Sequence, residues 1–262
     1  MVTVHEGIRL TYGDEPFQFG DLYVPEDGER HPVVILIHGG FWRATYDLSL
    51  MTKLAQELVA KRIATWNIEF RRVGNNGGGW PGTLLDVAQA SDYLMSIADE
   101  YKFDLQRVVA VGHSAGGHLA LWLGTRNSLA KKSELANSET PLKLRGAVSL
   151  AGAMDLEHVW RLGLGNDAVA EFLNGSPEKV PERYAAASPL EHLPLGIEQV
   201  LIHGTEDDRV PLIVSQEYAD RARSLGDTVK LIKLVGANHF VVIDPTAAAW
   251  SRVVDEIKRL MR

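Results

Sequence analysis

Short apolar segments alternate with longer amphipathic segments along most of the chain. The apolar segments are rich in valine and isoleucine, as expected for strands buried on both faces of a parallel sheet, and lie at 33–37, 63–70, 108–111, 146–150, 199–203 and 229–235. Helical spacing of apolar residues marks the segments between them, at about 48–62, 83–100, 213–225, 246–261 and after residue 114. This alternation, with two further strands near the N-terminus, predicts an α/β fold. Its mostly parallel sheet would have about eight strands and be flanked by helices.

Two regions depart from the alternation. Strand-like segments at 8–12 and 18–24 flank the turn-forming Gly13–Pro16, which predicts an antiparallel hairpin at one edge of the sheet. Residues 152–196 carry three short helical patterns where one crossover helix would be expected. Since no repeat or low-complexity linker divides the chain, we predict a single domain over residues 1–262 with a short helical cap insertion at about 152–196.

The composition narrows the functional classes. The chain has 262 residues, 45% of them hydrophobic and 23% charged, and its formal net charge of −7 argues against nucleic-acid or membrane partners. The absence of cysteine excludes disulfides, a thiolate nucleophile and cysteine-bound metals, but it leaves the redox compartment open. No apolar run is long enough to span a bilayer, and Met1–Gly7 does not resemble a secretory signal. We therefore expect a cytoplasmic protein. The sequence does not decide whether it forms a homodimer.

The segment Gly112-His-Ser-Ala-Gly116 stands between an apolar strand and a helical pattern. Strand, Gly-x-Ser-x-Gly and helix form the arrangement of a nucleophile elbow. A serine at such a sharp turn projects its hydroxyl beyond the sheet, and the two glycines let neighbouring backbone pass where a Cβ would clash. A glycine-rich connection with a solvent-facing serine would share the five-residue pattern. The prediction that Ser114 is a nucleophile therefore depends on the flanking strand and helix.

A serine hydroxyl needs a base, and the base needs a third group that holds its tautomer. In parallel α/β sheets, sites lie beyond the carboxyl ends of the strands, so these partners are sought where later strands end. Asp207 follows one such strand and His239 follows the last. The order Ser114, Asp207, His239 is the order of the triad in α/β-hydrolases.

With these motifs the chain resembles an α/β-hydrolase of the small-carboxylesterase and kynurenine-formamidase-like group. Four motifs between residues 38 and 239 carry the resemblance: His38-Gly-Gly-Phe-Trp42, Gly112–Gly116, an H-G-x-x-D-x-x-V-P match at His203–Pro211, and Gly236-Ala-Asn-His239. The first is similar to the H-G-G-x-W of arylformamidases and related esterases, whereas the elbow and acid motifs are shared across the superfamily. The acid motif implies that Asp207, rather than Glu206 or Asp208, completes the triad.

Two consecutive glycines after a buried strand allow the backbone to turn its N–H groups toward a carbonyl oxygen. We predict an oxyanion hole in the loop that contains Gly39, Gly40 and Phe41, with the N–H groups of Gly40 and Phe41 as donors. The N–H of Ala115, directly after the nucleophile, would be the third donor. A glycine turn that merely ends the strand is the alternative.

Aromatic residues near the motifs and in the cap are candidates for the substrate pocket: Trp42, Trp80, His113, Trp160 and Phe172. For the cap residues, packing of the cap on the sheet domain is the alternative. Other histidines receive structural interpretations. His118 shares a helix face with Ser114, and His203 ends a strand where a local hydrogen bond would hold it.

For one charged segment and one glycine-rich segment we predict no catalytic role. For Glu69-Phe-Arg-Arg72 we predict a strand end whose charged side chains are solvated. The glycines of Gly74–Gly79 do not have the spacing of a phosphate-binding loop, so this segment reads as a flexible loop near the pocket mouth. No histidine pair has metal-site spacing, and we expect neither a metal nor a cofactor.

The resemblance implies a serine hydrolase that cleaves small carboxylic esters or N-formyl aryl amides through an acyl-enzyme. Two alternatives stay open. One is a peptidase resembling the prolyl-oligopeptidase catalytic domain, although the chain has no room for the large extra domain of such enzymes. The other is a non-catalytic binding protein with a hydrolase fold, which the intact Ser114, Asp207 and His239 disfavour.

Overall fold

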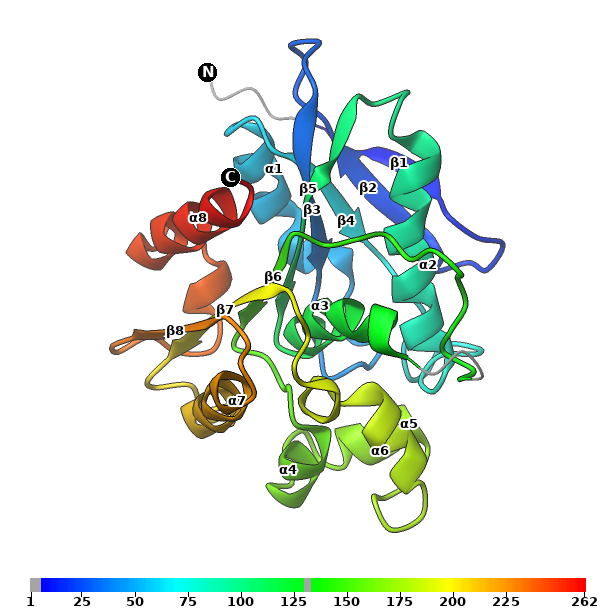
Figure 1. Cartoon of the computed structure of the whole chain (residues 1–262), viewed down its shortest axis with the longest axis vertical. Coiled ribbons are helices and arrows are strands. Elements are labelled where there is room, and N and C mark those ends of the chain that lie inside the picture. Colours follow the sequence, from blue (N-terminus) through cyan, green and yellow to red (C-terminus); the bar gives the residue numbers. More distant parts are fainter. Residues whose placement is uncertain (1–5, 130–132) are drawn as a thin grey trace.

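An eight-stranded sheet forms the centre of the molecule in the computed structural model, which describes residues 6–129 and 133–262 (Figure 1). Its order is β1-β2-β4-β3-β5-β6-β7-β8. The strands are β1 (Ile8–Thr11), β2 (Phe19–Tyr23), β3 (His31–Ile37), β4 (Ala64–Ile68), β5 (Phe103–His113), β6 (Gly146–Leu150), β7 (Glu198–Gly204) and β8 (Val229–Leu234). Both β1 and β4 run antiparallel to β2, and β3 to β8 are parallel. The predicted edge hairpin and mostly parallel sheet are confirmed.

Helices cover both faces of the sheet, which explains why the central strands are apolar without alternation. In β3, Val33, Ile35 and Ile37 belong to the core on one face, and Val34 and Leu36 to the core on the other. The first face is covered by α2 (Gly82–Ile97), α3 (Ala115–Thr125) and α7 (Leu212–Ser224), and the second by α1 (Thr52–Val59) and α8 (Ala248–Leu260).

Three short helices lie between β6 and β7 and gather at one end of the molecule, at the bottom of Figure 1. They are α4 (Leu156–Arg161), α5 (Ala168–Leu173) and α6 (Pro181–Ala187), followed by the 3₁₀ turn η3 (Pro189–His192). Three short helical elements were expected in this segment. The division of the chain into one domain with a cap at about 152–196 stays a prediction.

Two elements differ most from their predicted bounds. The helix predicted over 48–62 begins as a 3₁₀ turn, η1 (Leu48–Met51), and α1 ends at Val59, because Arg62 adopts a left-handed φ of 65°. Strand β5 extends well before the predicted 108–111, since Phe103 also pairs with His31. The remaining 3₁₀ turns are η2 (Arg126–Ser128) and η4 (Val241–Ile243).

No helix in residues 6–129 or 133–262 is long and apolar enough to cross a membrane. Most of Met1–Gly7, on which the expectation about a secretory signal rests, lies outside the described residues.

Candidate active site

Ser114 occupies the single position between the end of β5 and the start of α3. Its φ of 55° and ψ of −120° belong to a region that residues other than glycine rarely adopt. The Ser114 N–H donates to the Leu150 carbonyl over 2.8 Å, and the Ser114 carbonyl accepts from the His118 N–H over 3.2 Å. Neighbouring strand and helix thus hold the serine in the strained conformation of an elbow.

The two glycines of the elbow are required by close backbone approaches. A Cβ on Gly112 would lie 1.9 Å from the Gly116 carbonyl oxygen, and a Cβ on Gly116 would lie 2.2 Å from the Ile37 carbonyl oxygen. Real Cβ atoms do not tolerate such contacts, so larger residues at either position would displace α3 from β5 and β3.

His239 and Asp207 meet beyond the ends of β8 and β7. The His239 Nδ1–H donates to Asp207 Oδ2 over 2.7 Å, and both side chains are buried, with exposed fractions of 4% and 0%. Asp207 Oδ1 accepts the backbone N–H groups of Arg209 and Val210 over 2.9 and 2.8 Å. A carboxylate bound to Nδ1–H leaves Nε2 of His239 with the lone pair that a general base needs. Glu206 and Asp208 are exposed, so Asp207 is the acid that contacts the imidazole.

The surroundings of Asp207 keep it ionised. Burial raises the pKa of the carboxyl, but hydrogen bonds from His203 and His239 and from the Val210 N–H outweigh it, so the pKa lies well below its usual value. The His203 Nε2–H lies 2.8 Å from the Val210 carbonyl and 3.2 Å from Asp207 Oδ2, while its Nδ1 accepts from the Ser215 hydroxyl over 2.7 Å. His203 therefore supports the acid, in addition to the local hydrogen bonds that were expected.

The loop after β3 approaches the nucleophile closely. A Cβ on Gly39 would lie 3.0 Å from Ser114 Cβ and 2.8 Å from the His113 carbonyl oxygen. Three residues in a row then have positive φ, with 119° at Gly40, 52° at Phe41 and 57° at Trp42.

This conformation leaves backbone donors unused beside the serine. Within the described part of the chain, the N–H groups of Gly40 and Phe41 have no protein acceptor, and both residues line the same cavity as Ser114. Ala115 is the first residue of α3, so its N–H has no intrahelical acceptor. The three predicted donors are thus available around Ser114, and their role stays a prediction.

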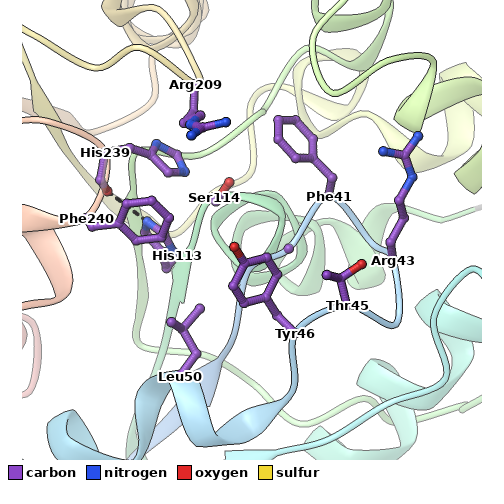
Figure 2. A pocket seen from close by; sticks show the side chains of 11 residues that line it. Phe41, Arg43, Thr45, Tyr46, Leu50, His113, Ser114, Arg209, His239 and Phe240 are labelled. Atoms are coloured by element: carbon purple, nitrogen blue, oxygen red, sulfur yellow. Dashed lines mark hydrogen bonds between the residues drawn. The ribbon is translucent and has the colours of Figure 1, made fainter.

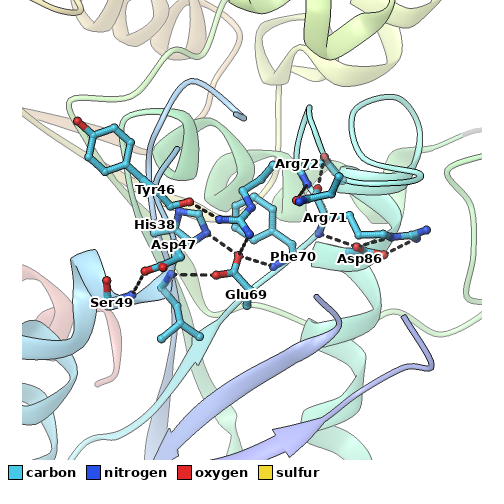
Figure 3. Close-up of polar contacts among 12 residues, drawn as sticks. His38, Tyr46, Asp47, Ser49, Glu69, Phe70, Arg71, Arg72 and Asp86 are labelled. Atoms are coloured by element: carbon cyan, nitrogen blue, oxygen red, sulfur yellow. Dashed lines mark hydrogen bonds and ion pairs between the residues drawn. The ribbon is translucent and has the colours of Figure 1, made fainter. Parts of the chain in front are cut away.

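The prediction of solvated charges at 69–72 is wrong for Glu69 and Arg72. Both are buried, with exposed fractions of 1% and 3%. Glu69 Oε1 accepts from His38 Nε2 over 3.1 Å and lies 3.2 Å from Arg72 Nη2, and Glu69 Oε2 accepts from the Leu48 N–H over 3.1 Å (Figure 3). Arg72 also donates to the Tyr46 carbonyl. The buried charges are tolerated because they pair with each other, and together they hold both ends of the loop from residue 38 to 48.

A cavity of about 230 Å³ opens above Ser114. Figure 2 shows its lining, which comes from the loop after β3, the 3₁₀ turn η1, the elbow, and the loops after β7 and β8: Gly40, Phe41, Arg43, Thr45, Tyr46, Leu50, His113, Ser114, Arg209, His239 and Phe240. The predictions missed Arg43, Thr45, Tyr46, Leu50, Arg209 and Phe240 as lining residues. Arg209 and Phe240 could have been predicted as lining residues because they are close in sequence to Asp207 and His239. For the lining residues after Trp42, no sequence pattern indicated the path of the loop.

Of the five aromatic candidates for the pocket, His113 lines this cavity and the other four do not. Trp42 and Phe172, the latter in α5, stack on each other with ring centroids 4.9 Å apart and are both buried in the core. Trp80 donates its backbone N–H to the Phe172 carbonyl, and Trp160 packs against the same core. These four residues join the short helices to the sheet domain. For Trp160 and Phe172, which lie in the predicted cap, this is the alternative that the sequence left open.

Two buried histidines beside the elbow are held neutral. Burial lowers the pKa of His113 to about 3 and that of His118 to about 4. The His113 Nε2–H donates to the His239 carbonyl over 2.9 Å, and its Nδ1 has no partner among the described residues. His118 donates to the Ala187 carbonyl over 2.8 Å and accepts from Trp42 Nε1 over 3.2 Å, the structural role expected for it.

Comparisons with known proteins agree with this geometry. The model of the BD-FAE family matches residues 20–221. The "Probable isoprenylcysteine alpha-carbonyl methylesterase" of Oryza sativa subsp. japonica is 26% identical over 95% of this chain, which spans 62% of that protein. The kynurenine formamidase of Meyerozyma guilliermondii is 30% identical over 80% of this chain and 78% of its own length.

Solved structures share the whole fold. A truncated carbohydrate esterase from gut microbiota superposes with a TM-score of 0.82 over 98% of this chain and 97% of its own, at 19% identity. This likeness confirms the predicted fold class.

Proposed function

Because the chain belongs to the BD-FAE family of α/β-hydrolases, we propose that it is a serine hydrolase acting on small carboxylic esters or N-formyl aryl amides. The observation that carries the proposal is the arrangement at the cavity. Ser114 and His239 line it together, Asp207 contacts His239 over 2.7 Å, and two backbone N–H groups beside the serine lack acceptors within the described residues. The names of the rice methylesterase and the yeast formamidase support the two bond types.

The reaction would proceed through an acyl-enzyme. His239 Nε2 takes the proton of the Ser114 hydroxyl while Oγ attacks the carbonyl carbon, and the carbonyl electrons move onto oxygen. The N–H groups of Gly40, Phe41 and Ala115 would stabilise this oxyanion. When the bond to the leaving group breaks, His239 returns the proton to the departing oxygen or nitrogen. Water then attacks the acyl-enzyme by the same steps and releases the acid and Ser114.

The size of the cavity supports small substrates. Its volume of about 230 Å³ is below the ~300–1,000 Å³ that is usual for drug-sized ligands. Phe41, Leu50 and Phe240 provide apolar walls, which suit a short acyl group or an aromatic ring.

A fluorophosphonate probe tests the proposal. We expect one adduct, which peptide mass mapping places on Ser114, and turnover of 4-nitrophenyl acetate that Ser114→Ala abolishes while circular dichroism shows an intact fold. A label on another residue, or full activity in the variant, would disprove the assignment. Absence of both labelling and turnover would favour a binding protein, and faster cleavage of a prolyl-peptide amide than of any ester would favour a peptidase.

The cytoplasmic location and the homodimer that the sequence leaves open stay predictions. Fractionation of cells and sedimentation of the purified protein check them.

A further inference from the structure

Apart from the triad, every charged side chain in the described lining of the cavity is positive. Arg43 and Arg209 are among the described lining residues, and none of these residues is an aspartate or a glutamate. This is unexpected in a protein whose formal net charge is −7. A cavity whose described lining has arginine and no carboxylate suggests that it recognises a negative group.

Arg43 is already committed to other partners. Its Nε donates to Glu171 Oε2 over 2.6 Å, and its Nη1 and Nη2 donate to the Gly165 and Asn166 carbonyls over 2.7 and 2.6 Å. These bonds join the loop after β3 to the segment before α5, and Glu171 compensates the charge. Arg43 therefore has little capacity left for a ligand.

Arg209 is different, because its side chain has only one weak partner in the described part of the chain. The nearest carboxylate belongs to Asp208, at 3.8 Å from Nε, and the two side chains are 59% and 72% exposed, so this pair is weak. Among the described residues, Arg209 makes no other side-chain ion pair or hydrogen bond. Figure 2 shows its guanidinium at the rim of the cavity, on the side where Ser114 and His239 lie.

The backbone of Arg209 is also placed by the triad itself. Its N–H donates to Asp207 Oδ1 over 2.9 Å, the same carboxylate that holds His239. The guanidinium thus starts from a point that is set relative to the catalytic base. Leu50 and Phe240 also line the cavity and are apolar, so Arg209 is the one cation among the described lining residues that a negative group entering the pocket could bind.

We propose that Arg209 determines specificity by binding a carboxylate on the substrate, so that the enzyme prefers esters or formamides that carry a negative charge beside the scissile bond. A guanidinium suits this task because its planar donors can bind both oxygens of a carboxylate. The inference rests on the proposed function, since it names the substrate class of the same site.

Matched substrate pairs test the proposal. The 4-nitrophenyl monoester of glutaric acid carries a carboxylate on the acyl side and 4-nitrophenyl valerate does not. Similarly, 4-acetoxybenzoate carries it on the leaving group and methyl 4-acetoxybenzoate does not. The readout is the ratio of kcat/KM between the charged and neutral members of each pair. We expect a ratio above one in at least one pair, and that pair identifies the side that carries the charge.

Two variants with the same change in net charge complete the experiment. Arg209→Gln should lower the ratio about tenfold or more, mainly through KM of the charged ester, because hydrogen bonds to charged groups are lost. Arg221→Gln, on an exposed part of α7, should leave the ratio within about twofold of the wild type. Added salt should reduce the wild-type preference, since an exposed cation is screened.

Two results would overturn the inference: a wild-type ratio at or below one in both pairs, or an equal ratio in the wild type and Arg209→Gln. Its failure is distinguishable from failure of the proposed function. If only the inference about Arg209 fails, the neutral esters are still hydrolysed and Ser114 is still labelled. If the proposed function fails, neither occurs.

Discussion

Three successive acidic residues after β7 have different surroundings. Asp207 is buried against His239 and His203, while Glu206 and Asp208 are exposed. The side chains of adjacent residues point in different directions, so the contact with His239 belongs to one of them. A motif match places the acid at this residue, and the hydrogen bonds explain why the neighbours cannot replace it.

The first prediction concerns this acid. Asp207→Asn retains the shape of the side chain but offers His239 an amide in place of a carboxylate, and in other serine triads the equivalent change lowers kcat by about 10⁴. Asp208→Asn and Glu206→Gln, as matched controls, should lower it by about tenfold or less, through local effects on the loop. Steady-state kinetics on one ester at pH 8 compares the three variants. A severe loss in Asp208→Asn with a mild one in Asp207→Asn would contradict the contact seen here.

At the scale of an element, the loop from residue 38 to 48 is positioned by a charge beneath it. Glu69 accepts hydrogen bonds from His38 and from the Leu48 N–H, and Arg72 connects it to the Tyr46 carbonyl. The loop contains the predicted oxyanion donors and part of the cavity wall. A carboxylate that contacts no part of the cavity thus controls the conformation of the site.

The second prediction follows from this network. Glu69→Gln leaves Arg72 buried without its counter-charge, so the free energy of unfolding should fall by about 3–5 kcal/mol. In the fraction that stays folded, kcat should fall about tenfold or more while KM changes little, because donors to the oxyanion act in the transition state. Urea unfolding and kinetics measure the two effects.

Glu57→Gln is the matched control, since Glu57 of α1 makes a partly exposed ion pair with Lys61, just past the end of that helix. It should change neither quantity appreciably. A Glu69→Gln protein with the kcat and stability of the wild type would show that the buried carboxylate does not position the loop.

At the scale of the whole molecule, stability depends on buried histidines. His113 and His118 have exposed fractions of 1% and 0%, and burial lowers their pKa values from 6.5 to about 3 and about 4. Between pH 6.5 and 4 the unfolded chain therefore binds protons that the folded chain does not. The stabilising contribution of the neutral side chains is complete above pH 6.5 and is lost as the pH falls toward these lowered values.

The third prediction is a loss of stability in mild acid. Moving from pH 7 to pH 5 should cost about 2 kcal/mol for each of these two histidines, since one pKa unit corresponds to about 1.4 kcal/mol. His118→Gln removes one of them outside the triad, so the difference in unfolding free energy between pH 7 and pH 5 should shrink by about 2 kcal/mol. Urea unfolding at both pH values checks this. An identical difference in wild type and variant would mean that His118 is not buried in its neutral form.

Which parts of this protein could be predicted depends on how local their causes are. The alternation of apolar and amphipathic segments determined the sheet and its covering helices, because strands buried on both faces and helices buried on one have distinct periodicities. The elbow glycines and the placement of Asp207 and His239 after strands were equally readable, since parallel strands bring their carboxyl ends to one edge. Tertiary structure alone decided that Glu69 and Arg72 are buried partners, that Trp42 and Phe172 pack in the core, and that Arg209 faces the cavity. Each of these depends on which side chains from distant segments meet, and no local pattern of hydrophobic and polar residues encodes that meeting.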